Sequence, residues 1–164
     1  MIRIAVCLLL LASTAGAEPT TVLDGTAPWR VELPPGFTAD DALEDLDEGG
    51  QLAGWRDGAG RRIVVGRLRG NTDDGLAGER SYFAGLEEGV AKDTPGYRKL
   101  RSARRKLPRS LVAYDLWFRS GDAVRGARFV ILRGYALVLI VHAPRMRRID
   151  PALRGALESF VPEP

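Results

Sequence analysis

The sequence has little of the chemistry on which most enzymes and metal proteins depend. Its 164 residues contain one cysteine, Cys7, and one histidine, His142. A disulfide needs two cysteines, and zinc needs several cysteine, histidine or carboxylate ligands. A catalytic triad needs a nucleophile and an orienting acid beside the histidine, and no serine lies in an elbow motif. We therefore expect no enzyme, no cofactor and no metal site, and we interpret His142 as a partly buried structural residue.

The sequence after the N-terminal segment also lacks a phosphate-binding loop and a membrane-spanning helix. The glycine pair at Gly66 and Gly70 lacks the Lys-Ser/Thr ending of a phosphate-binding loop. The apolar run Tyr135–Val141 is too short to cross a membrane as a helix, which takes roughly 20 residues. We expect no transmembrane segment after the N-terminal signal described next.

The N-terminus has the pattern of a secretory signal. Arg3 precedes the apolar segment Ile4–Ala12, and Ala15-Gly16-Ala17 is a small-x-small cleavage pattern. Cys7 lies inside the apolar segment, which argues against lipidation. We expect a signal peptide over 1–17, a flexible lead over 18–28 and a single domain over 29–162, so that the protein is exported to the periplasm or secreted. An uncleaved anchor helix is the alternative.

The stretch from Ala127 to Ala143 is the strongest fold signal. Two apolar runs meet at Arg133-Gly134, and glycine can adopt the positive φ that closes a hairpin. A two-residue turn predicts the pair Leu132 with Tyr135. The second run has no polar side chain except the tyrosine hydroxyl, which indicates a strand near the middle of a sheet, buried on both faces.

The remaining patterns predict an α+β fold with a central antiparallel β-sheet of about six to seven strands, flanked by two main helices. Alternation and turn residues predict the strands, and apolar stripes at helical spacing predict the helices. Asp150-Pro151 is a strong helix start. The expected strands are 29–33, 51–56, 61–69, 97–107, 110–119, 127–132 and 135–143, and the expected helices are 76–92, 151–160 and a short one from Thr38 in the acidic segment.

Two short motifs in this order resemble PsbP-like and DcrB-like domains. The opening Trp29–Phe37 (WRVELPPGF) and the closing Ala156–Phe160 (ALESF) carry the resemblance, which covers about residues 29–162. It implies a central antiparallel sheet flanked by helices. Plant members of that group assist photosystem assembly, and many exported bacterial members have no settled role. No functional residue carries over to this chain.

Charge is nearly balanced overall, at +3, but it is unevenly distributed. Asp40–Glu48 is acidic, while two other stretches are basic. The basic residues could contact a protein or an anionic envelope polymer, or could only prevent strand pairing at a sheet edge. Nucleic acid is not expected, because Tyr97 is the sole aromatic residue there. The candidate contact residues are Arg98, Lys99, Arg101, Arg104, Arg105, Lys106, Arg109, Arg145, Arg147 and Arg148.

Two further groups of residues leave alternatives open. The acidic run could bind Ca²⁺ or form a solvated face, although its spacing does not fit an EF-hand. Trp29, Trp55 and Trp117 could line a ligand groove, but we favour packing in the core. The expected function is an exported non-enzymatic domain acting by protein or polyanion contact. The alternative is a small-ligand or metal-binding module with a pocket between sheet and helix.

Overall fold

The computed structural model describes residues 19–22, 29–40, 50–68, 79–108, 110 and 112–162. The expected signal peptide lies outside the described residues, and so does most of the acidic run, residues 41–48. Within the described ranges, no helix is long and apolar enough to cross a membrane.

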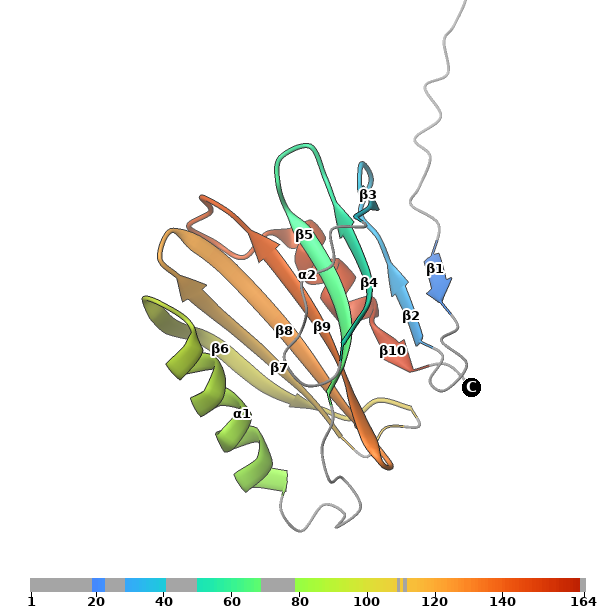
Figure 1. Cartoon of the computed structure of the whole chain (residues 1–164), viewed down its shortest axis with the longest axis vertical. Helices are drawn as coiled ribbons and strands as arrows, with labels where there is room; N and C mark the ends of the chain where they lie inside the picture. Colours follow the sequence, from blue (N-terminus) through green and yellow to red (C-terminus); the bar gives the residue numbers. More distant parts are fainter. Residues whose placement is uncertain are drawn as a thin grey trace, which may run out of the picture.

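A seven-stranded antiparallel sheet forms the centre of the molecule (Figure 1). The predicted fold class, an α+β fold with an antiparallel sheet and two main helices, is confirmed. The helices are α1 (Glu79–Asp93) and α2 (Pro151–Ser159). In spatial order the strands are β3 (Thr38–Ala39), β4 (Gln51–Arg56), β5 (Arg62–Leu68), β9 (Tyr135–Ala143), β8 (Ala123–Leu132), β7 (Val112–Ser120) and β6 (Tyr97–Arg105).

The β8–β9 hairpin is confirmed as the middle of this sheet. Leu132 pairs with Tyr135 across the two-residue turn, and Gly134 has a φ of 81°. β9 is fourth of the seven strands. Its side chains alternate between two separate cores, so the strand is buried on both faces as the unbroken apolar run predicts.

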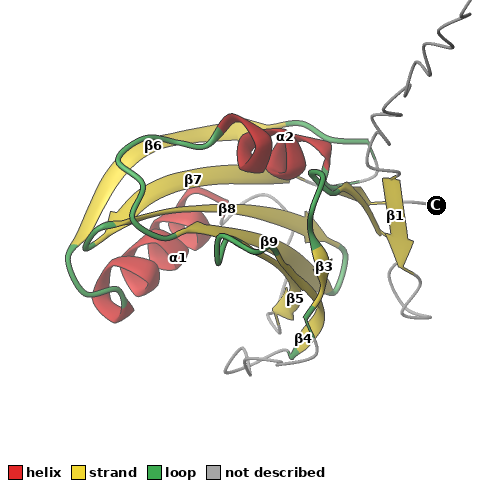
Figure 2. Cartoon of the chain, turned by 90° about the horizontal axis from the view of Figure 1, so that it is seen from above, coloured by secondary structure: helices red, strands yellow, loops and turns green. Residues whose placement is uncertain are grey.

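Each face of the sheet is covered by one helix (Figure 2). On one face, Leu153 and Leu157 of α2 pack on β9 residues such as Leu139. Asp150 accepts hydrogen bonds from the backbone N–H groups of Ala152 and Leu153, so the predicted cap of α2 is confirmed. On the other face Phe83 of α1 packs with Val138 and its neighbours.

A second, three-stranded sheet corrects the expected position of the first domain strand. β2 (Trp29–Glu32) pairs with β1 (Pro19–Val22) and β10 (Val161–Pro162), and it does not join the central sheet. Its alternation of buried and exposed residues is as expected. Alternation reports which side chains are buried, but it does not report which neighbour a strand pairs with.

The expected helix beginning at Thr38 is wrong at its start. Thr38 and Ala39 form β3 and pair with Arg56 and Trp55 of β4. The Asp40 carboxylate accepts hydrogen bonds from Arg56 and does not cap a helix. The rest of that expected helix lies in the part of the chain that the structure does not describe.

The three tryptophans are core residues, as favoured from the sequence. Trp29, Trp55 and Trp117 are 0%, 7% and 5% exposed and belong to one hydrophobic cluster beneath α2. The ring of Trp29 contacts Trp55 and Phe160 at centroid distances of 6.1 and 5.9 Å. Their burial in the core therefore stabilises the fold.

Candidate functional site

The basic strand β6 is an edge strand of the central sheet. It is hydrogen-bonded to β7 on one side and ends the strand order. Figure 2 shows it along the margin of the curved sheet. An edge strand presents one row of unpaired backbone groups, and basic side chains there discourage pairing with other edges. The edge position is therefore consistent with both interpretations of the basic stretch.

A β-bulge at Leu100 divides the basic side chains between the two faces of the sheet. The register shifts between Lys99 and Arg101, and Leu100 is 39% exposed. Arg101 therefore lies opposite Trp117, on the face that α2 covers, while Lys99 lies opposite Phe118, on the α1 face. Without the extra residue the two cations would share a face, because side chains alternate along a strand.

Some of the basic residues are used within the molecule. Lys99 Nζ lies 2.8 Å from the Glu87 carboxylate of α1, and this hydrogen bond raises the pKa of Lys99. Arg105 Nε donates to Asp115 at 3.0 Å. Arg104 is exposed and also has a partner within the protein. These side chains stabilise the edge and are less free to bind another molecule.

The other basic residues extend into solvent. Arg98, Arg101 and Lys106 are exposed, as are Arg145, Arg147 and Arg148 in the loop before α2. The described part of the chain supplies no hydrogen bond or ion pair to these six side chains. We call these six residues the basic edge. The remaining candidate, Arg109, lies outside the described residues.

Both parts of the basic edge meet at one end of β7. Arg98 is the cross-strand neighbour of Arg119, and the Arg119 guanidinium donates to the backbone carbonyl of Arg147. The loop before α2 therefore lies beside the first residues of β6, so the basic residues of the loop and of the strand can form one surface. The acidic Asp40 does not neutralise it, because its carboxylate binds Arg56 and Arg62.

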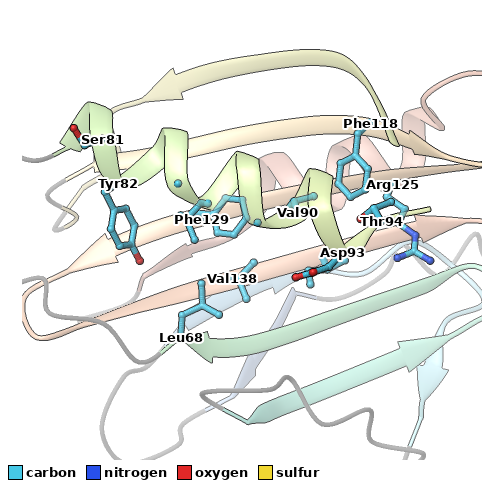
Figure 3. Close-up of a pocket in the computed structure, with 15 residues that line it drawn as sticks. Leu68, Ser81, Tyr82, Val90, Asp93, Thr94, Phe118, Arg125, Phe129 and Val138 are labelled. Carbon is cyan, nitrogen blue, oxygen red and sulfur yellow. The ribbon is translucent and has the colours of Figure 1, made fainter. Parts of the chain in front are cut away.

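A groove between α1 and the sheet is a second candidate site, and Figure 3 shows the residues that line it. Its volume is about 840 Å³, within the range of roughly 300–1,000 Å³ typical of small-molecule sites. α1 is held over β6 and β7, where Phe83 stacks on Tyr114 at 4.7 Å and Glu87 binds Lys99. The strands β8, β9 and β5 therefore supply most of the groove floor, through Ala127, Phe129, Val138, Ile140 and Leu68.

The two ends of the groove are polar and its middle is apolar. Tyr82 lies toward one end, and Asp93, Thr94 and Arg125 lie toward the other (Figure 3). Burial raises the pKa of the Tyr82 hydroxyl. Arg125 Nε is shielded from solvent and has no hydrogen-bond partner. The arrangement suits a molecule with an apolar body and a polar end.

Two glycines of α1 line this groove. Gly85 and Gly89 weaken a helix by about 1 kcal/mol each relative to alanine, and close packing on the sheet is the usual reason to keep them. Here a Cβ atom at either position would meet nothing within 4 Å. The missing side chains therefore leave the groove open, and they do not bring the helix closer to the sheet.

The structure places the single histidine of the chain on β9. His142 is partly buried near the end of β9, as expected, and it has an interaction partner within the protein. In the described ranges, no three histidine, cysteine, aspartate or glutamate side chains come together as a metal site would need. The segment Asp45–Gly49, considered for Ca²⁺, lies outside them.

Comparison with solved structures confirms the expected fold. No protein-family model and no curated protein sequence matches the chain. The chain is similar to cyanobacterial PsbP (CyanoP) from Synechocystis sp. PCC 6803, with a TM-score of 0.59, 16% identity and coverage of 91% of this chain and 95% of that one. It is similar to a protein of unknown function, PA94, from Pseudomonas aeruginosa (TM-score 0.52, 19% identity, coverage 90% and 99%).

A third similar structure is LpqN of Mycobacterium tuberculosis, described as involved in cell envelope biogenesis, with a TM-score of 0.49, 15% identity and coverage of 90% and 91%. At these identities the similarity concerns the fold alone. The predicted resemblance to PsbP-like domains is thus confirmed as a shared fold, over nearly the whole length of the first two structures.

Proposed function

We propose that this chain is an exported, non-enzymatic domain that binds an acidic partner through the basic edge. The observation that carries the proposal is the cluster of exposed arginines, Arg98 and Arg101 of β6 beside Arg147 of the following loop, without partners in the described part of the molecule. Several like charges held together attract an anionic surface more strongly than scattered ones, and they speed encounter. Export rests on the signal pattern of residues 1–17 and is part of the proposal.

The partner proposed is an acidic protein surface or an anionic polymer of the cell envelope. An extended acidic segment suits the site best, because β6 also offers unpaired backbone groups for strand addition. Arginine forms paired hydrogen bonds with carboxylates and phosphates, so it favours either kind of partner over a neutral one. Nucleic acid is not proposed.

The direct test is capture of partners from an envelope extract. The bait is the mature chain with Arg98, Arg101 and Arg147 changed to glutamate, compared with the unchanged chain at low and high salt. The matched control changes Arg80, Lys92 and Arg133 to glutamate, three exposed cations elsewhere on the surface. The proposal expects a partner that the first variant loses and the control retains. Equal loss in both variants, or a partner insensitive to salt, contradicts it.

A second function is favoured by the groove beneath α1. Its volume, apolar middle and partnerless Arg125 Nε are those of a binding site for a small molecule. On this proposal the domain carries a ligand in addition to contacting a partner. Retention of a small molecule during purification, detected by mass spectrometry of the extracted protein, supports it.

A further inference from the structure

Arg125, which lines the α1 groove, belongs to a row of arginine and histidine side chains across three neighbouring strands. Arg125 of β8 lies opposite His142 of β9, and His142 lies opposite Arg62 of β5. Residues directly opposite one another in an antiparallel sheet point to the same face. Arg125 lines the groove on the α1 face, so all three side chains are on that face. Arg62 also binds Asp40, at 3.2 Å.

Arg125 carries a buried donor without an acceptor. Its Nε atom is shielded from solvent and makes no hydrogen bond within the described residues. A buried donor left unsatisfied is costly, and an anionic oxygen is the acceptor that a guanidinium binds most strongly. The Arg125 guanidinium is therefore complementary to an anion placed at this end of the groove.

The rest of the groove is complementary to a hydrocarbon chain. Leu86, Val90, Phe129 and Val138 lie along its middle. The lining residues of α1 run from Ser81 to Asp93, which at 1.5 Å per residue is about 18 Å of helix. Such an elongated apolar surface suits a long acyl chain better than a compact metabolite. Asp93 lines the same end as Arg125 but is exposed to solvent, which screens its charge.

We propose that the groove binds a single-chain amphiphile, with its acyl chain beneath α1 and its anionic head group on Arg125. The inference rests on the second proposed function and names its ligand class. It also explains the two α1 glycines, because side chains at Gly85 and Gly89 would occupy the space that the chain takes. The head group is a carboxylate or a phosphate ester, which share the charge and the acceptor oxygens.

The test measures the binding of four probes, three with a palmitoyl chain and octanoate, by isothermal titration calorimetry below their micelle concentrations. Palmitate supplies a carboxylate, palmitoyl-lysophosphatidylglycerol a phosphate ester, and monopalmitoylglycerol an uncharged head group. We expect saturable one-to-one binding of at least one anionic probe, at least tenfold tighter than the neutral probe. Octanoate should bind at least tenfold more weakly than palmitate, since each buried methylene contributes roughly a fourfold factor. The tighter anionic probe identifies the head group.

Variants of groove residues distinguish binding in the groove from nonspecific hydrophobic binding. Gly89→Leu fills the groove and should abolish binding while melting no lower than the unchanged protein, because leucine favours helix and its Cβ meets nothing within 4 Å. Gly155→Leu is its matched control in α2, where a Cβ also meets nothing within 4 Å, and it should bind normally. Arg125→Gln should weaken the anionic probe about tenfold or more and leave the neutral probe unchanged.

Three results would overturn the proposal: no saturable binding of either anionic probe, normal binding by Gly89→Leu, or an equal effect of Arg125→Gln on charged and neutral probes. The glutamate variant of Arg98, Arg101 and Arg147 keeps the groove intact, so it should bind the amphiphile normally. Loss of amphiphile binding in that variant alone would assign the binding to the basic edge. The two proposals therefore fail separately.

Discussion

At the scale of single residues, the pair Asp115–Arg128 joins the sheet to the end of α2. Both side chains are buried, at 4% and 3% exposed. The guanidinium donates to both carboxylate oxygens, at 2.6 and 2.9 Å, and to the backbone carbonyls of Glu158 and Phe160. Carbonyls at a helix C-terminus favour a nearby cation. The pair therefore holds together β7, β8 and the residues after α2.

Replacing Asp115 with alanine should destabilise the protein by about 3 kcal/mol, since it leaves a buried arginine charge without its carboxylate. Denaturant unfolding measures this loss. Glu158→Ala is the control, because it removes an exposed ion pair of 3.6 Å with Arg154 and keeps the carbonyl that Arg128 uses. We expect a change below about 0.5 kcal/mol for the control. Similar losses for both variants would mean that the buried pair contributes no more than a surface one.

Asp57 gives the protein a predictable response to acid. Burial acts to raise the pKa of this carboxyl, but hydrogen bonds from the side chain and backbone of Arg61 outweigh it, so the pKa lies below its ordinary value. A lowered pKa in the folded state contributes stability above the ordinary value, about 4, and this contribution is lost as pH falls through the folded pKa.

Asp57→Asn should therefore be less stable than the unchanged protein at pH 7, by about 1 kcal/mol. The difference should persist from about pH 7 to 5 and shrink below about pH 4, as the carboxyl of the unfolded chain and then that of the folded protein take up a proton. Unfolding free energies measured across this range test the expectation. A difference as large at pH 3 as at pH 7 would show that the charge of Asp57 contributes nothing.

At the scale of elements, α1 depends on one glutamate for its position over the sheet. Glu87 accepts hydrogen bonds from Lys99 of β6 and Tyr114 of β7, at 2.8 and 3.1 Å. Phe83 stacks on the same tyrosine. Among the described residues, the hydrogen bonds of Glu87 link α1 to the sheet, and the apolar contacts of the helix form one strip. We therefore expect α1 to open before the central strands do.

Glu87→Ala should increase hydrogen exchange along α1 by about fivefold, corresponding to about 1 kcal/mol from the lost hydrogen bonds, with little change in β8 and β9. Glu88→Ala is the matched control, because Glu88 is the next residue and is exposed. Hydrogen exchange read by mass spectrometry distinguishes the two. Equal exchange of α1 in both variants contradicts the anchoring role of Glu87.

The elements that could be predicted are those whose own residues determine them. The β8–β9 hairpin follows from its turn glycine and unbroken apolar run, and α2 follows from its Asp-Pro start. The β2 strand could be predicted but its sheet could not, because the partners β1 and β10 are distant in sequence. Thr38 was predicted to begin a helix, since pairing with β4 is a tertiary contact that local capping patterns do not report.

The candidate sites were predictable only in part for the same reason. The count of basic residues indicated a charged edge, but the bulge at Leu100 decides which of them share a face. Gly85 and Gly89 lower the stability of the predicted helix over 76–92. That they border a groove follows only from the empty space around them in the structure. Nothing in the sequence indicates that Arg125 belongs to a candidate site, because its neighbours His142 and Arg62 come from other strands.

At the scale of the whole molecule, the fold separates two surfaces. The basic edge lies at the end of the sheet and in the loop before α2, while the groove lies under α1 on the opposite face. Both helices are needed to cover a sheet whose central strand is buried on each side. On the two proposals above, the domain holds a ligand on the α1 face of the sheet and contacts a partner at the β6 edge.

The measurement that tests the central claim most directly is the affinity of the mature chain for a polyglutamate peptide at two salt concentrations. Wild-type binding should weaken steeply as salt rises. Replacing Arg98, Arg101 and Arg147 with glutamate should reduce the affinity at least tenfold at low salt. The control variant, with glutamate in place of Arg80, Lys92 and Arg133, has the same net charge. Its affinity should fall by less than about threefold. Equal reductions in the two variants would contradict a defined basic contact surface.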